Sequence, residues 1–367
     1  MNVSDMIKGV MNMIEAADIR PRDEVLILAD VRSDALSLDA IKSGLIAHGA
    51  IPSLLITEPI KRYGHVPQHV LDAMAAVDVA IWVWPVFLTF TPAHMAMGRN
   101  REQSGSQHKE ARAKPYHVYF EGKAGLLARD YAKFPNKLLW KIAEKVRDVV
   151  GAGKIVHIVD DIGTDLTATY DGSKLYGMQF RAGDPPGRCH FPWGRCGVYD
   201  GSGDANGVVH ISAVQGVAGL LPEPMRWEVK DGWVTDVRGG GPIGVETKKM
   251  FEQVPGSNKF VEIMFGYHPK ASIQYGIEDP LHWELNGKMP WAGLGTPRRH
   301  NVFRHIDGSV MNGRLFINDR LIVDKFGMLD PSFYADAEVV ALAREFGDPD
   351  EVLAPVSHAA HGSGTLW

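Results

Sequence analysis

The chain has 367 residues, of which 45% are apolar and 23% charged, and its 39 basic and 44 acidic side chains give a net charge of −5. This composition is ordinary for a globular protein that buries a sizeable core, and the length is sufficient for two domains. The slightly acidic balance gives no case for the basic surface that nucleic acids and anionic membranes attract, so we expect neither as a partner.

The sequence favours a cytoplasmic location. Residues 1–19 carry acidic side chains and have no long apolar core, unlike a secretory signal. The longest apolar run, residues 77–93, is interrupted by a proline and is too short to span a membrane. Two cysteines, Cys189 and Cys196, flank what we expect to be a loop, and they are too few for a disulfide scaffold. With His190 they are a weak candidate for a zinc site, because their spacing matches no standard zinc pattern.

Residues 1–152 have the pattern of an α/β domain with a parallel sheet. Three apolar runs predict buried strands at residues 24–30, 52–57 and 79–84. Residues 33–50, between the first two runs, predict a helix that ends at a glycine. Residues 133–153 predict the clearest helix, because apolar residues recur there at steps of three and four. No phosphate-binding glycine motif follows any of these strands, so a nucleotide site is not expected.

Residues 153–367 predict a β-rich α+β domain, which we expect to carry a metal site. Short alternating runs separated by turn residues predict strands at residues 154–160, 164–170, 207–214, 232–241, 259–267, 313–319 and 320–327. Residues 336–347 predict a short helix near the end of the chain. Between the two halves, we place the domain boundary at residues 152 and 153.

A histidine and an aspartate two residues apart, His305 and Asp307, are the strongest candidates for metal ligands. They lie in the run VFRHID, and on a strand residues two apart project from the same face. Glu262 lies in the apolar run KFVEIMFGY, where a buried carboxylate is costly unless it is paired or binds a metal. One histidine and two carboxylates suit divalent iron, manganese or zinc. A polar pair in a turn and an outward-facing glutamate are the alternative interpretations.

Other catalytic patterns are weaker. The chain has no GxSxG motif for a serine nucleophile, and Cys196 has no general base nearby other than His190. No pair of carboxylates has the pattern of a glycosidase.

Three motifs resemble those of the aminopeptidase T family of metallopeptidases, in the same order along the chain. They are IGTDLTATYDG, VEIMFGYHP and FRHID, and the resemblance places metal ligands on Glu262, His305 and Asp307. Two further ligands of that family are replaced, because Arg195 stands in the motif GRCGVYD and Trp291 in the motif WAGLG. The resemblance therefore implies one metal ion, since a two-metal site needs ligands for both ions.

One branch of this fold, the 2,5-dihydroxypyridine 5,6-dioxygenases, has lost the same two ligands. The stretch CHFPWGRCGVYDGSGDANG resembles a motif of that branch and places its catalytic histidine on His190. The third metal ligand of the branch is a histidine where this chain has Glu262. The second catalytic histidine of that branch matches residues 88–89 of this chain, which are not histidines. The resemblance therefore implies that this role is absent here or is taken by His94.

The resemblance implies a mononuclear Fe(II) dioxygenase that opens a hydroxylated pyridine or related ring, with Mn(II) or Zn(II) as alternative metals. His190 would transfer a proton, since a histidine titrates near neutral pH. Aromatic and cationic residues that could frame a flat anionic small molecule include Arg195, Tyr267, Trp291 and Arg299. A metal-dependent hydrolase of a small amide or heterocycle, with the same ligands, is the alternative, and a non-catalytic binding protein is a third interpretation.

Two expectations concern the wider molecule. The resembling fold is oligomeric, and exposed strand edges are commonly covered by a partner, so we expect a homo-oligomer. Residues 98–114 form a long polar segment that is either a lid over the site or a solvated linker.

Overall fold

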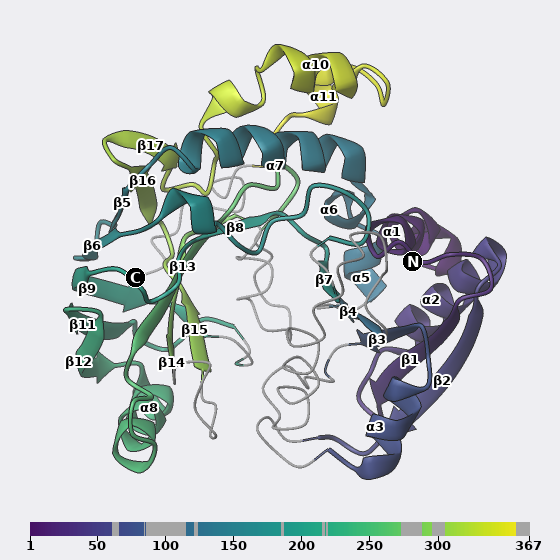
Figure 1. The fold of residues 1–367 in the computed structure, drawn as a ribbon, viewed down its shortest axis with the longest axis horizontal. Coiled ribbons are helices and arrows are strands. Elements are labelled where there is room, and N and C mark those ends of the chain that lie inside the picture. The colour runs from purple at the N-terminus through teal and green to yellow at the C-terminus, as the bar shows by residue number, and fades with distance from the viewer. Residues whose placement is uncertain are drawn as a thin grey trace. The chain divides into compact units, whose positions relative to one another are not determined.

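The computed structural model describes most of the chain, and two compact units can be distinguished in it (Figure 1). The described residues are 1–60, 66–83, 85, 115–120, 124–184, 187–214, 217, 219–272, 288–295 and 305–356. The first unit consists of Met1–Lys137 and Gln179–Trp193, and the second of Leu138–Met178 and the residues from Gly194 on. None of the helices in these ranges has the length and the apolar character that crossing a membrane requires.

The first unit contains the predicted parallel sheet, with the strand order β2-β1-β3-β4-β7. Its strands are β1 (Glu24–Asp30), β2 (Ile51–Thr57), β3 (Val79–Val83), β4 (Tyr116–Phe120) and β7 (Arg188–Phe191). The three strands predicted in this half are confirmed, and β1 and β3 are buried as expected. The expected burial of β2 is wrong, because this strand lies at the edge of the sheet and is largely exposed. The expected loop between Cys189 and Cys196 is wrong in part, because each cysteine lies within a strand, and both are buried. In β7 the buried Cys189 and Phe191 flank the half-buried His190, an alternation too short to detect in the sequence.

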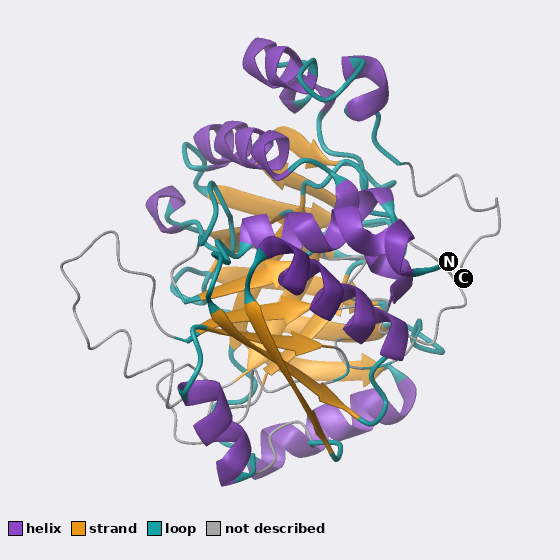
Figure 2. Ribbon diagram, turned by 90° about the vertical axis from the view of Figure 1, so that its right-hand side faces the viewer, coloured by secondary structure: helices purple, strands orange, loops and turns teal. Residues whose placement is uncertain are grey.

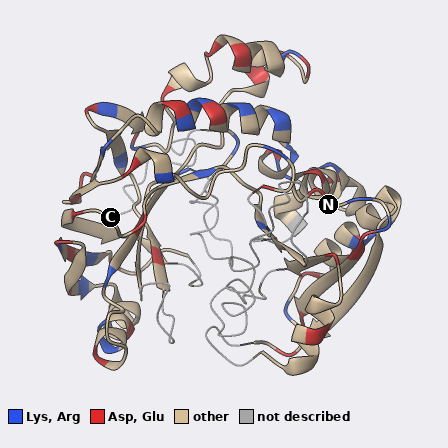
Figure 3. Cartoon of the chain, viewed as in Figure 1, with Lys and Arg blue, Asp and Glu red and all other residues tan. Residues whose placement is uncertain are grey.

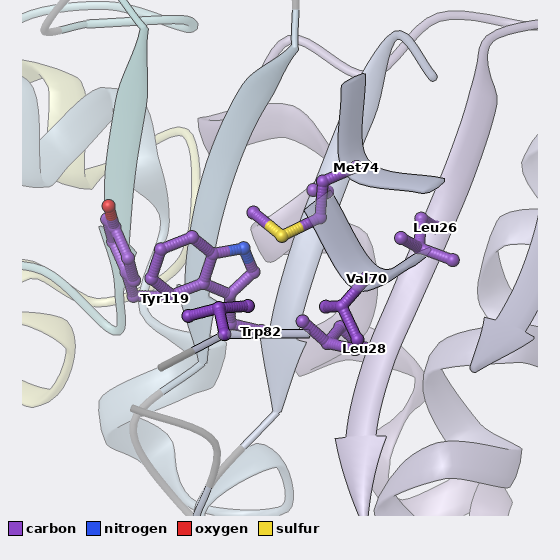
Figure 4. Packing of buried hydrophobic residues seen from close by; sticks show 8 residues of the cluster. Leu26, Leu28, Val70, Met74, Trp82 and Tyr119 are labelled. Carbon is purple, nitrogen blue, oxygen red and sulfur yellow. The ribbon is translucent and has the colours of Figure 1, made fainter. Parts of the chain in front are cut away.

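Helices cover this sheet (Figure 2). They are α1 (Val3–Ala16), α2 (Ala35–His48), α3 (Gln68–Ala75), α5 (Ala124–Leu127) and α6 (Asp130–Lys133). The predicted helix α2 begins after the capping residue Asp34 and ends at Gly49, whose φ of 91° is left-handed. Val70 and Met74 of α3 lie against Trp82 of β3 in a buried cluster (Figure 4). Burial of this apolar surface fixes α3 on the sheet.

The second unit contains two antiparallel sheets, and the predicted β-rich region is confirmed. A five-stranded sheet has the order β10-β15-β14-β13-β8, with β8 (Arg195–Tyr199), β10 (Ala213–Val214), β13 (Phe260–Gly266), β14 (Trp291–Gly295) and β15 (His305–Ser309). A seven-stranded sheet has the order β12-β11-β9-β6-β5-β16-β17, with β5 (Ile155–Val159), β6 (Asp165–Thr169), β9 (Ala205–Ile211), β11 (Met225–Lys230), β12 (Trp233–Gly239), β16 (Arg314–Ile317) and β17 (Arg320–Val323).

The helical segments of the second unit are α7 (Asn136–Val150), which starts at the end of the first unit, α8 (Gly241–Gln253), α10 (Ala337–Ala343), α11 (Pro349–Val352) and two 3₁₀ turns, Gly172–Lys174 and Pro331–Phe333. Both basic and acidic side chains lie along the predicted helix α7 (Figure 3). Lys145 of α7 lies 3.2 Å from Asp336, the N-cap of α10, so ion pairs join these two helices. Helix α8 was not predicted, because it begins at the last of three consecutive glycines with positive φ and buries few residues.

Candidate metal centre

Three adjacent strands of the five-stranded sheet bring the candidate ligands together. The register places Glu262 of β13 opposite Gly293 of β14, and Gly293 opposite Asp307 of β15. His305 precedes Asp307 by two residues in the same strand, so both project from the face that carries Glu262. The histidine and the aspartate therefore lie in a strand and not in a turn.

This face is turned away from the seven-stranded sheet. Gly308 follows Asp307 and points to the opposite face, where an added Cβ atom would lie 2.2 Å from the Cγ2 atom of Ile211 in β9. The two sheets thus pack through the face that Gly308 shares, and the three candidate ligands are left on the other face.

The side chains converge within bonding distance of a common point. His305 Nε2 lies 3.1 Å from Glu262 Oε2 and 2.5 Å from Asp307 Oδ1, and one donor atom from each residue lies within 4.8 Å of the others. All three side chains are largely buried, with exposed fractions of 11% for His305, 14% for Glu262 and 5% for Asp307. Within the described part of the chain, no other group of histidine, cysteine and acidic side chains meets the same distance.

The electrostatics of this group favour a bound cation. Burial lowers the pKa of His305, but the negative charges of Asp307 and Glu262 outweigh burial and raise that pKa to about 9. The imidazole is thus held as a cation between two carboxylates when no other positive charge is present. A divalent ion would replace that proton and neutralise the two carboxylates.

The donor set fits a metal ion. Donor atoms that bind one ion at about 2.1 Å and at right angles lie about 3 Å apart, close to the spacings around His305 Nε2. Two carboxylates and one imidazole on one face suit divalent iron, manganese or zinc and leave other coordination positions open. Glu262, His305 and Asp307 could therefore hold a single ion.

Two of the proposed substrate-binding residues meet on the same sheet. The Arg195 guanidinium carbon lies 5.7 Å from the centroid of the Trp291 ring, a cation–π contact, and Arg195 is 8% exposed. Trp291 precedes Gly293 by two residues in β14 and so shares its face. Tyr267 follows directly after β13 and is 1% exposed, a burial typical of core packing.

His190 lies in the first unit, near the carboxyl end of β7. Its ring centroid is 4.5 Å from that of Tyr119 and 5.3 Å from that of Trp193. Tyr119 in turn contacts Trp82 at 4.6 Å, edge to face, so three neighbouring strands carry an aromatic row that ends at His190. This row was missed in the sequence, because only the strand register brings its members together.

The remaining candidates divide into two groups. His94, Arg299 and residues 98–114 lie outside the described residues. The zinc alternative finds no support in the strands, because Cys189 and His190 are neighbours in β7 and project from opposite faces. Burial also raises the pKa of the Cys196 thiol, which disfavours the thiolate that zinc binds.

One family model matches part of the chain. The model of the 2,5-dihydroxypyridine 5,6-dioxygenase family matches residues 107–258, less than half of the chain. The resemblance seen in the sequence is confirmed. The matched segment contains His190 and Arg195 and ends before Glu262. A search of curated proteins found no match.

Two solved structures have a similar fold. 2,5-Dihydroxypyridine dioxygenase from Pseudomonas putida KT2440 has a TM-score of 0.59 and 13% identity, over 89% of this chain and 96% of that one. Aminopeptidase T from Thermus thermophilus has a TM-score of 0.59 and 12% identity, over 89% of this chain and 99% of that one. At these identities the likeness shows the fold alone.

Proposed function

We propose that the protein is a mononuclear, metal-dependent dioxygenase that opens a hydroxylated pyridine or a related aromatic ring. The observation that carries this proposal is the convergence of Glu262, His305 and Asp307 on one sheet face, in a chain that matches the dioxygenase family model. The small-molecule substrate follows from that family. A homo-oligomer in the cytoplasm remains the expectation from the sequence.

The three ligands would hold one divalent ion, for which iron is the first candidate. Fe(II) would supply the electrons and the open coordination positions that dioxygen chemistry needs. The protein side of the reaction is positioning and proton transfer. Glu262, His305 and Asp307 would hold the ion, and Fe(II) bound by three protein ligands would have open positions for the substrate.

A second metal ion next to this group is disfavoured by Arg195. Its guanidinium is always charged, is buried, and is fixed on the Trp291 ring. A further cation beside it would be repelled at low local dielectric. This supports a one-metal enzyme over a two-metal peptidase.

Arg195 and Trp291 would also select the substrate. A guanidinium binds a carboxylate or a phenolate oxygen through charge-assisted hydrogen bonds, and an indole ring packs well against a planar ring. His190 would take a proton from a substrate hydroxyl group or return one to the product, as the resemblance implies. A flat ring with an acidic oxygen is the substrate that these side chains fit.

Hydrolysis is the second candidate, and the donor set leaves it open. Two carboxylates and one histidine place more negative charge on the ion than two histidines and one carboxylate, which suits a hard ion such as Mn(II). In that case the ion would lower the pKa of a bound water and small amides would be the substrates.

Anaerobic purification, followed by metal analysis and oxygen uptake with dihydroxylated pyridines and catechols, would separate these functions. We expect about one iron per chain and uptake that is lost in His305→Ala. His157→Ala is the matched control, because His157 pairs with Asp165 on the seven-stranded sheet, away from the ligands. One zinc or manganese without uptake would shift the assignment to a hydrolase, and protein that binds no metal would overturn both.

A further inference from the structure

Strand β14 lies between β13 and β15, the two strands that carry the candidate ligands. Its residue between Glu262 and Asp307 is a glycine, which has no side chain. Gly293 of β14 is the register partner of Glu262 on one side and of Asp307 on the other. A Cβ atom on Gly293 would lie 2.7 Å from Asp307 Oδ1, 2.9 Å from Glu262 Cβ and 3.3 Å from Glu262 Oε2. The side chains of both neighbours thus occupy the space that any other residue would need.

The requirement for glycine here is steric and not conformational. Gly293 lies inside a strand and is not among the glycines with positive φ, so the backbone would accept alanine. The atoms that an alanine would meet cannot easily move. Glu262 Cβ is fixed to the backbone of β13, and the short Asp307 side chain is 5% exposed and in contact with His305.

We propose that Gly293 is a positioning residue of the metal centre: its missing side chain lets Glu262 and Asp307 reach the same ion across β14. This inference rests on the proposed metal site. An alanine would push the two carboxylates apart or turn one of them away, while the hydrogen bonds of the sheet could remain. Because small displacements around ligands weaken metal binding, we expect Gly293→Ala to lower metal affinity about 10- to 100-fold.

The matched control is Gly308→Ala. Gly308 lies in the neighbouring strand β15, and its Cβ atom would meet Ile211 Cγ2 at 2.2 Å on the opposite face of the sheet. This substitution crowds a core side chain without touching the carboxylates, so it measures the cost of crowding alone.

Titration of the metal-free proteins with Co(II) tests the inference without any activity assay, because calorimetry gives the affinity and the visible spectrum reports the ligands. We expect weaker binding and an altered spectrum for Gly293→Ala, and near-normal binding for Gly308→Ala even if its melting temperature falls further. Wild-type affinity in Gly293→Ala would overturn the inference while leaving the metal site intact. A wild type that binds no ion would overturn the proposed function and this inference with it.

A double variant covers the case in which Gly293→Ala does not fold. Asp307→Ala removes the atom nearest to the added Cβ, so Gly293→Ala should reduce the melting temperature less in the Asp307→Ala background than in the wild type. Equal reductions in both backgrounds would show that Gly293 acts elsewhere and would overturn the steric account.

Discussion

Arg195 and Trp291 lie against each other, with the guanidinium carbon 5.7 Å from the ring centroid, on two strands that flank β13. In the sequence these are the two positions where the resembling metallopeptidases carry additional metal ligands. A cation–π contact between largely buried groups contributes about 2 kcal/mol. The contact therefore fixes one positive charge on the Trp291 ring.

Arg195→Lys should weaken substrate binding more than it affects metal binding. Lysine keeps the charge but has neither the planar fork nor the stacking surface of arginine. Since a charge-assisted hydrogen bond contributes about 1.5–3 kcal/mol, KM for an anionic ring should rise about 10- to 100-fold. Steady-state kinetics together with metal analysis would check this. Loss of metal in Arg195→Lys would show that Arg195 supports the ligands instead. Trp291→Phe keeps an aromatic face, so it should raise KM less than Arg195→Lys does.

Removal of the metal should lower the melting temperature without unfolding the protein. The protonated His305 replaces part of the positive charge when the ion is absent, since its pKa is raised to about 9. An ion present at 100 times its dissociation constant should add about 2.7 kcal/mol to the free energy of unfolding. Calorimetry with and without a chelator would measure the difference, and Asp307→Asn should abolish it. Identical melting curves for the wild type with and without chelator would contradict a bound ion.

The sequence predicted those parts of the fold that depend on local patterns. The strands at 24–30 and 79–84 are nearly continuous apolar runs, as expected for buried parallel strands, and the helix at 133–153 has a clear apolar period. Non-local pairing was not predictable. Residues 179–193 return to the first unit because β7 pairs with β4, and no local pattern specifies that partner.

The sequence predicted which residues form the metal group but not how the strands bring them together. His305 and Asp307 could be placed on one face, because strand alternation is a local rule. The position of Glu262 beside them depends on β14, which stands between the two ligand strands, and on a bulge in β13 that shifts the register. For the same reason Gly293 was overlooked: the sequence WAGLG gives no indication that its glycine faces two carboxylates.

His190→Ala should reduce kcat about 100- to 10,000-fold if His190 transfers a proton, with metal content unchanged. Tyr119→Leu should reduce kcat less and shift the pH profile, because the ring 4.5 Å from His190 would be lost and the imidazole would gain freedom to rotate. Tyr119→Phe keeps the ring and is the control. The pH dependence of kcat distinguishes positioning from folding defects. An unchanged kcat in His190→Ala would remove the histidine from the mechanism.

Lys288 should make stability depend on pH above pH 8. It is 2% exposed, and its ammonium group donates hydrogen bonds to the carbonyl oxygens of Ala271, at 3.1 Å, and of Val356. Burial lowers its pKa from 10.5 to about 8, against a smaller opposite effect of Asp324. Between these two values the unfolded chain binds more protons than the folded one, so the folded state becomes more stable as pH rises.

The size of this effect can be isolated with Lys288→Met, which keeps most of the buried apolar volume. A pKa difference of this size corresponds to about 3 kcal/mol, an upper value for the change in the free energy of unfolding between pH 8 and pH 10.5. Denaturant unfolding of both proteins at several pH values would give the difference between their free energies of unfolding. The contributions of other titrating groups cancel in this difference because both proteins share them. We expect the wild type to gain stability relative to Lys288→Met over this range. A difference that stays constant with pH would mean that Lys288 has a normal pKa and reaches solvent.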